Sequence, residues 1–123
     1  MAVDFADLDR DGRLDFFVVD MLSPDTRLRK RQHPGEVPVA SITGVIDDRP
    51  QVLRSTLFRD RGDGTYEELA DYAGIAASDW SWSAIFVEVD LDGFEDLLVG
   101  AGHFRNVQDM VAERVIRSRQ HPW

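Results

Sequence analysis

The stretch Asp7-Leu8-Asp9-Arg10-Asp11-Gly12-Arg13-Leu14-Asp15 carries acidic residues at its first, third, fifth and ninth positions and a glycine at its sixth. Carboxylates this close together repel one another, so a folded hairpin gathers them when a cation offsets the repulsion. Calcium takes about six to eight oxygen ligands, and the glycine permits the sharp bend that turns alternate side chains toward one point. The stretch therefore predicts a calcium loop; an acidic, solvated turn is the alternative interpretation.

The expected ligands in this loop are the side chains of Asp7, Asp9, Asp11 and Asp15 and the main-chain carbonyl of Arg13. The apolar residues on both sides, within 3–5 and 14–19, are types that favour strands, so the loop should join two strands. An EF-hand would instead need flanking helices and a glutamate at the twelfth position, which is Val18 in this chain. The pattern favours a strand–loop–strand calcium site.

A second copy of the pattern occupies Glu88-Val89-Asp90-Leu91-Asp92-Gly93-Phe94-Glu95-Asp96, again between apolar segments. The offset is constant, since 88 − 7 = 81 and 96 − 15 = 81. Its matching acidic residues are Glu88, Asp90, Asp92 and Asp96, with glutamate in place of the first aspartate. Such a repeat indicates consecutive units of one array, and arrays of this kind usually need about three units or more. Because 123 residues hold fewer than two periods, we expect a fragment of a longer chain.

Composition narrows the classes of function. The chain has 23 acidic and 14 basic residues and a formal net charge of −9, which argues against a nucleic-acid partner. Cysteine is absent, so disulfides and thiolate metal sites are excluded. No apolar run approaches the ~18 residues of a membrane span, and the N-terminal residues lack the pattern of a signal peptide. If the parent protein is exported, we expect its signal upstream of this chain.

The positions of turn residues, helix caps and apolar patterns divide the chain into consecutive segments. They are a strand–calcium loop–strand unit over 1–20, an insertion or connection over 21–52, a hairpin over 53–78, a second strand–calcium loop–strand unit over 79–104, and an amphipathic helix with a tail over 105–123. The insertion should begin with a short helix through about Gln32, introduced by Ser23 and Pro24, and hold at most one strand near 39–45.

Two apolar patterns predict burial. Residues 16–19 run without polar interruption, so we expect both faces of that strand to be covered. Every second residue from 80 to 86 is apolar, which predicts one face of a strand shared by Trp80, Trp82, Ala84 and Phe86. Tryptophans are mostly buried, so this face is expected to pack in the core, with stacking on a sugar as the alternative.

Taken in order, the motifs resemble bacterial FG-GAP/VCBS repeat proteins of the cartilage-acidic-protein type. The residues that carry the resemblance are Phe5–Val18, Leu57-Phe58-Arg59, Gly62-Asp63-Gly64-Thr65-Tyr66, Ala73-Gly74-Ile75, Asp79-Trp80-Ser81-Trp82 and the second acidic loop. The resemblance implies about two blades of an integrin-α-like β-propeller with four-stranded antiparallel sheets, so the expected fold is mainly β. It implies about two calcium ions, with the Phe94 carbonyl completing the second ligand set, and an extracellular, cell-surface or periplasmic parent protein. Glu88 departs from the usual aspartate, which puts the geometry of the second site in doubt.

The function expected on these grounds is a non-catalytic scaffold or recognition module that binds a protein or glycan through the full propeller. One alternative is part of a glycan-active hydrolase or lyase that uses its acidic residues as acid and base. Another is a free-standing, dockerin-like calcium module. Arg61-Gly62-Asp63 also matches a cell-adhesion tripeptide, although a glycine-rich hairpin turn explains it equally well.

Overall fold

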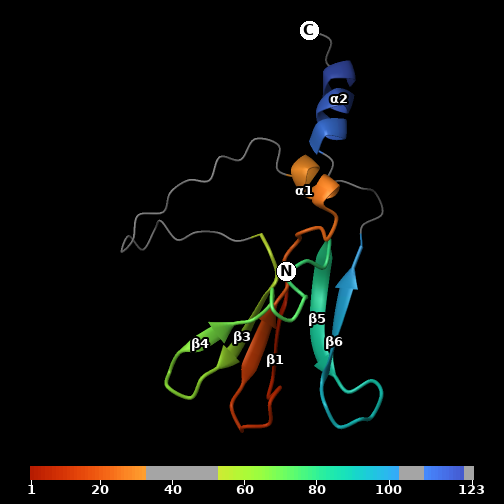
Figure 1. The fold of residues 1–123 in the computed structure, drawn as a ribbon. Helices are drawn as coiled ribbons and strands as arrows, with labels where there is room; N and C mark the ends of the chain where they lie inside the picture. The colour runs from red at the N-terminus through yellow and green to blue at the C-terminus, as the bar shows by residue number, and fades with distance from the viewer. Residues whose placement is uncertain (33–52, 103–109, 121–123) are drawn as a thin grey trace.

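The computed structural model describes residues 1–32, 53–102 and 110–120, and the described chain is mainly β (Figure 1). Its elements are β1 (Val3–Ala6), β2 (Asp15–Val18), α1 (Thr26–Gln32), β3 (Thr56–Asp60), β4 (Tyr66–Glu68), β5 (Ser81–Val87), β6 (Asp96–Ala101) and α2 (Met110–Gln120). The first four strands form one antiparallel sheet in the order β1-β2-β3-β4, and β5 and β6 form a second, two-stranded antiparallel sheet. The strand expected near 39–45 lies outside the described residues.

The 81-residue repeat is present in the strand pairing. Phe5 pairs with Phe16 between β1 and β2, and Phe86 pairs with Leu97 between β5 and β6. Both partners are displaced by the same offset, since 86 − 5 = 81 and 97 − 16 = 81. The second sheet is therefore the structural equivalent of the β1–β2 half of the first sheet. Figure 1 shows the acidic loops of both hairpins at the same end of the molecule and the helices at the other end.

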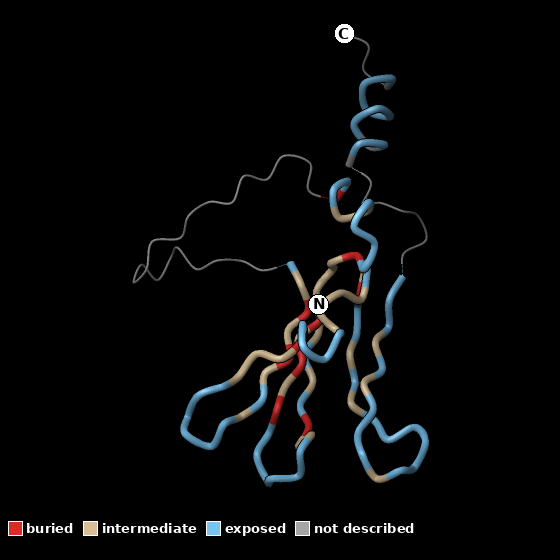
Figure 2. Tube along the Cα trace, viewed as in Figure 1, coloured by how far each residue is buried: buried red, intermediate tan, exposed pale blue. Residues whose placement is uncertain are grey.

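The hydrophobic core lies where the two sheets meet (Figure 2). The buried residues of the first sheet and its following loops are Phe17, Val19, Leu57 and Ala70. The half-buried residues that the second sheet packs against them are Ala84, Phe86, Leu97 and Val99. The backbone N–H of Phe86 also donates to the Asp4 carboxylate at 2.7 Å, which ties β5 to β1. Burial of apolar surface between the sheets is the main favourable term in such a fold.

The opposite face of the first sheet carries an aromatic row. The ring of Phe16 stacks on Phe58 with centroids 4.8 Å apart and also contacts Phe5 and, edge-on, Tyr66. This face is open, because Phe5 and Tyr66 are about half exposed, at 54% and 47%. Phe16 and Val18 themselves are half-buried on this face, so the prediction that both faces of residues 16–19 are covered is confirmed for the face of Phe17 and Val19 and only in part for this one. Covering it takes apolar surface that the described residues do not supply.

The first helix, α1, forms after Ser23 and Pro24 as predicted and ends at Gln32. The Ser23 hydroxyl accepts a hydrogen bond from Asp25 N at 3.2 Å, and the Asp25 carboxylate accepts one from Arg27 N at 2.7 Å. Asp25 is thus the residue that caps the helix, since its side chain satisfies an N–H that the first turn leaves unpaired. Ser23 supports the turn that leads into the cap.

The second helix contacts α1 and points away from the sheets (Figure 1). Its apolar residues Val111, Val115 and Ile116 are exposed, so the expected apolar stripe exists but is not packed against the sheets. Residues 105–109, which the predicted helical segment also includes, lie outside the described residues.

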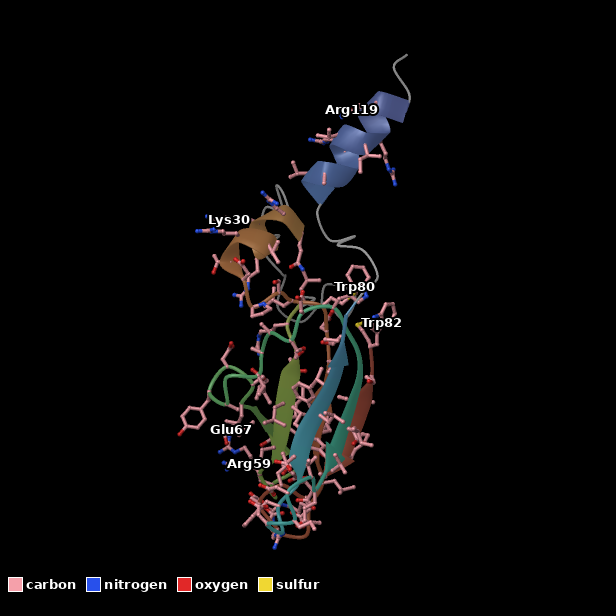
Figure 3. The ribbon with its side chains drawn as sticks, turned by 90° about the vertical axis from the view of Figure 1, so that its right-hand side faces the viewer. Lys30, Arg59, Glu67, Trp80, Trp82 and Arg119 are labelled. Atoms are coloured by element: carbon pink, nitrogen blue, oxygen red, sulfur yellow. The ribbon has the colours of Figure 1, made fainter. Side chains whose placement is uncertain are left out.

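The expectation for the tryptophan pair is wrong for Trp82. A register shift between Ser81 and Ser83 breaks the alternation, and Trp82 is 55% exposed. Its indole N–H donates to the Gly102 carbonyl at 2.7 Å, and its ring lies 6.0 Å from that of Trp80. Figure 3 shows both indoles near the end of β5 that faces the helices, far from the acidic loops. A bulge re-aims a side chain in this way because it inserts an unpaired residue into one strand.

Candidate metal site

The first acidic loop connects β1 to β2 through two residues with positive φ, Arg10 at 60° and Gly12 at 85°. Glycine reaches this region without steric cost, and nothing lies within 4 Å of the position that a Cβ on Gly12 would take. The Asp7 carboxylate holds the bend by accepting hydrogen bonds from Asp11 N at 3.0 Å and Gly12 N at 2.9 Å. The backbone therefore brings the first and fifth positions of the loop together.

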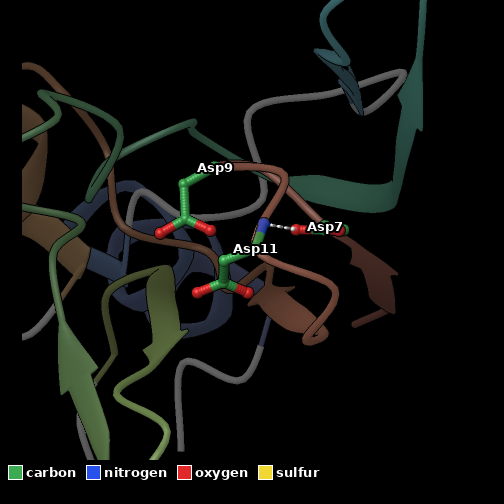
Figure 4. A group of neighbouring side chains, drawn as sticks. All are labelled: Asp7, Asp9 and Asp11. Carbon is green, nitrogen blue, oxygen red and sulfur yellow. Dashed lines mark hydrogen bonds between the residues drawn. The ribbon is translucent and has the colours of Figure 1, made fainter.

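Three of the expected ligands converge in this loop (Figure 4). One carboxylate oxygen from each of Asp7, Asp9 and Asp11 lies within 4.8 Å of the other two. Asp9 and Asp11 are exposed, and Asp9 makes no hydrogen bond or ion pair in the described part of the chain. Oxygens at this separation can contact one cation about 2.3–2.6 Å from each of them. Solvent reaches the group through the exposed Asp9 and Asp11.

Asp15 lies outside this group of three, and its expected role as a ligand stays a prediction. It is almost fully buried, at 2% exposure, and its carboxylate accepts hydrogen bonds from Leu8 N at 3.1 Å and from Asp60 N at 2.9 Å. The structure does not place Asp15 in the three-carboxylate group; it joins the loop to β3 instead. The Arg13 side chain pairs with Asp11 and lies 3.4 Å from the Asp60 carboxylate. The expected role of the Arg13 carbonyl stays a prediction.

The second acidic loop has the same backbone. Leu91 and Gly93 have φ values of 62° and 90°, at the positions of the two residues with positive φ in the first loop. The Glu88 carboxylate accepts a hydrogen bond from Gly93 N at 2.5 Å, as Asp7 does from Gly12 N. The hydrogen bonds of its fifth and ninth positions also match those of the first loop: Asp92 accepts from Phe94 N and Asp96 from Val89 N, as Asp11 accepts from Arg13 N and Asp15 from Leu8 N. The repeat thus extends to these hydrogen bonds but not to that of the fifth-position N–H, which donates to Asp7 in the first loop and to Asp90 in the second.

The two loops differ in how their acids are arranged. Within residues 1–32, 53–102 and 110–120, the group of three converging acids is the one in the first loop, so Glu88, Asp90 and Asp92 do not form its counterpart. Asp96 is exposed, whereas its equivalent in the first loop is buried. Glutamate at the first position places its carboxylate one bond farther from the backbone, which changes where its oxygens lie. The expected roles of these residues and of the Phe94 carbonyl stay predictions.

A direct contact joins the loops. The Arg10 guanidinium lies over the Phe94 ring, 4.3 Å from its centroid, in a cation–π arrangement. Its Nη2 atom is also 3.4 Å from the position of a Cβ on Gly93. Sequence reasoning missed this contact, because nothing in the spacing of the two loops indicates that their tips meet. Arg10 therefore places a positive charge between two acidic loops.

Two other carboxylates have perturbed pKa values. The Arg54 guanidinium donates to Glu68 at 2.5 Å, and this hydrogen bond lowers the pKa of the Glu68 carboxyl below its ordinary value of 4.5. The Thr65 hydroxyl and backbone N–H lower the pKa of Asp63 in the same way. Asp63 belongs to the adhesion-like tripeptide, and its carboxylate is thus engaged within its own turn. Both perturbations are explained by local structure.

Comparisons with protein-family models, with curated proteins and with solved structures give no match for this chain. Neither helix in the described part of the chain has the length and apolar content that crossing a membrane requires. The three histidines, His33, His103 and His121, lie outside the described residues. The acidic loops are therefore the features of this chain that indicate its function.

Proposed function

We propose that this chain is a non-catalytic, calcium-binding repeat segment that serves as a scaffold or recognition module. The observation that carries the proposal is the convergence of the Asp7, Asp9 and Asp11 carboxylates on a bend that recurs 81 residues later. Like charges held this close destabilise a loop unless cations offset them, and of these three carboxylates Arg13 offsets only Asp11 in the described part of the chain. A hard divalent cation with oxygen ligands fits this group better than a transition metal, which favours imidazole or thiolate.

The same proposal assigns the two sheets to blades of a β-propeller within an exported protein. It is supported by the four-stranded antiparallel meander, by the second sheet packed against it, and by the resemblance of the ordered motifs to FG-GAP/VCBS repeats. In this assignment calcium rigidifies the loops at one end of the array, and the full array binds a protein or glycan. Extracellular modules work with dissociation constants of about 10⁻⁴–10⁻³ M, which suits an exposed site.

An acid–base enzyme is the competing class. Glycoside hydrolysis requires two carboxyl groups that face a substrate from opposite sides, in environments that separate their pKa values. Asp9 and Asp11 instead lie side by side on one exposed loop (Figure 4). This arrangement suits a single ion better than a general acid and a general base.

The deciding experiment is a calorimetric calcium titration of the chelator-treated chain and of Asp9→Asn. Asp9 is the best probe because it supports no hydrogen bond, so the change removes charge without removing a structural contact. Glu95→Gln is the matched control: it makes the same change in charge on an exposed residue outside the expected ligand set. We expect about two calcium sites in the unmodified chain, loss of one site in Asp9→Asn, and no loss in Glu95→Gln.

The proposal fails if calcium does not bind at up to about 10 mM, well above the range of weak extracellular sites. It also fails if Asp9→Asn and Glu95→Gln weaken calcium equally, because the effect would then be that of net charge alone. Circular dichroism of both variants checks that neither change unfolds the chain.

A further inference from the structure

The contact between the two sheets joins faces that are not equivalent in the repeat. Face A of each unit holds the residues Val3, Phe5, Phe16 and Val18 in the first and Ala84, Phe86, Leu97 and Val99 in the second, each pair displaced by the same 81 positions. Face B holds Asp4, Ala6, Phe17 and Val19 in the first unit and Ile85, Val87, Leu98 and Gly100 in the second. Successive strand residues point to opposite faces, so the two sets are on opposite sides of each sheet.

Face B of the first unit packs on face A of the second. Phe17 and Val19 belong to the buried cluster, and Ala84, Phe86, Leu97 and Val99 pack against that cluster. The hydrogen bond from Phe86 N to the Asp4 carboxylate runs between the same two faces. Figure 1 shows β1 beside β5, where this contact is made. The molecule therefore contains one internal interface in which a face B packs against a face A.

The complementary pair of faces is left open. On face A of the first unit, Val3 and Phe5 are 50% and 54% exposed. On face B of the second unit, Ile85 and Leu98 are 49% and 57% exposed. Both surfaces are apolar and lie on opposite sides of the described molecule. A monomer that exposes two such sheet faces has surfaces typical of protein interaction sites.

We propose that copies of this chain associate head to tail, with face A of the first sheet of one copy packed on face B of the second sheet of another. The occupant of each open face is thus the other open face, on a second copy. Continuity with the internal interface supports this choice, because face A of the first unit is equivalent, position by position, to the half-buried face A of the second unit that forms the internal interface. An interface between unlike patches propagates: it generates a ring if the rotation closes and an open array if it does not.

The intermolecular contact should be weaker than the internal one. Ile85 stands where Asp4 stands in the first unit, so the hydrogen bond that Asp4 accepts from Phe86 N has no counterpart. Gly100 stands in the place of Val19, which removes a buried side chain from that face. The association therefore depends on apolar contacts, and we expect it to be reversible and concentration dependent. It does not require the acidic loops to bind calcium.

Sedimentation velocity tests the proposal with two matched variants, Val3→Glu and Leu98→Glu. Each places one negative charge on one open face, at a residue about half exposed, so each should fold. We expect the unmodified chain to form assemblies that grow with concentration, and each variant alone to raise the dissociation constant by about tenfold or more. Mixed together, the variants should form dimers that grow no further, because one intact face of each kind remains and the two are complementary.

Several results would overturn the proposal: a chain that stays monomeric to millimolar concentration, a mixture of variants that stays monomeric, or a variant that self-associates as well as the unmodified chain. Self-association by one variant alone would point to a symmetric contact between like faces. Circular dichroism checks folding, and Val3→Ser with Leu98→Ser is a milder pair if a glutamate prevents it. Repeating the measurement with chelator separates this result from the calcium proposal, since head-to-tail association should persist without calcium.

Discussion

The two acidic loops share a backbone but differ in their surroundings. Gly12 and Gly93 have φ values within a few degrees of each other, and the first-, fifth- and ninth-position carboxylates accept from equivalent backbone N–H groups at Gly12 and Gly93, Arg13 and Phe94, and Leu8 and Val89. In the first loop the ninth-position acid, Asp15, is buried and also accepts from Asp60 N on β3. In the second loop its equivalent, Asp96, is exposed.

The difference shows which features of a loop are local. The bend and its hydrogen bonds depend on residues within nine positions of one another, so an equivalent sequence reproduces them. Burial of the ninth-position acid depends on a third strand that lies against the hairpin. Within the described chain, β3 provides this support for the first loop, and β6 has no further strand beside it. The first loop is thus supported by a hydrogen bond from β3 to Asp15, and in the described chain the second loop is supported only by its own hairpin.

The largest effect is expected from the substitution of Asp15, the buried one of the two ninth-position acids. Asp15→Ala leaves the N–H groups of Leu8 and Asp60 without the carboxylate that accepts from them, so we expect it to lower the free energy of unfolding by about 3 kcal/mol. Asp96→Ala should lower it by about 1 kcal/mol or less, because water replaces an exposed acceptor. Urea denaturation in the presence of chelator measures both values. Equal losses in the two variants would contradict the account of the two loops.

The next effect concerns the ligand sets. Glu88→Asp gives the second loop the first-position residue of the first loop, and we expect its calcium affinity to rise by about threefold to tenfold. The reciprocal change, Asp7→Glu, should weaken the first loop, whose carboxylates converge. Titration of single-site chains, with Asp9→Asn or Asp92→Asn silencing the other loop, assigns each affinity. No change in either variant would mean that support from β3, rather than the first ligand, separates the loops.

A smaller effect is expected in the pH dependence of the free energy of unfolding, through the hydrogen bond between Arg54 and Glu68 on β4. The Arg54 hydrogen bond lowers the pKa of Glu68 in the folded chain, so ionised Glu68 stabilises the fold. This contribution is fully present above the ordinary value of 4.5 and is lost as the pH falls through the lowered folded value. We expect Glu68→Gln to reduce the free energy of unfolding by about 1 kcal/mol at pH 7.

The same comparison at about pH 3 should show a smaller difference, because the pH is then below the ordinary pKa of 4.5 and protonation of Glu68 in the unfolded chain opposes folding. Urea titrations at both pH values supply the measurement. A loss that is constant with pH would mean that the side chain acts through its shape and not through its charge.

The smallest effect addresses the contact between the loops. In a double-mutant cycle of Arg10→Met and Phe94→Leu, we expect an interaction energy of about 0.5 kcal/mol, typical of an exposed cation–π pair. Unfolding curves for the four chains provide the cycle. Arg10→Met should also strengthen calcium binding slightly at low salt, because a positive charge leaves the neighbourhood of both loops. An interaction energy of zero would show that the loops are independent.

Much of this molecule could be predicted from short-range patterns. The strands around both loops, the hairpin over 56–68, the helix ending at Gln32 and the 81-residue offset all follow from alternation, turn residues and glycine positions. The convergence of Asp7, Asp9 and Asp11 also follows, since the bend that gathers them is built within the loop. These features depend on backbone angles and hydrogen bonds between near neighbours in sequence, which similar residues reproduce wherever they occur.

Other features were decided only when distant segments packed. The burial of Asp15 depends on β3, the contact between Arg10 and Phe94 depends on how the sheets meet, and the exposure of Trp82 depends on a bulge in β5. The open faces of the two sheets belong with them, because periodicity marks an apolar face without naming what covers it. By itself the sequence determined the loops, the strands and the repeat. The tertiary structure decided which acid is buried and which faces stay exposed, because burial depends on contacts between residues far apart in the chain.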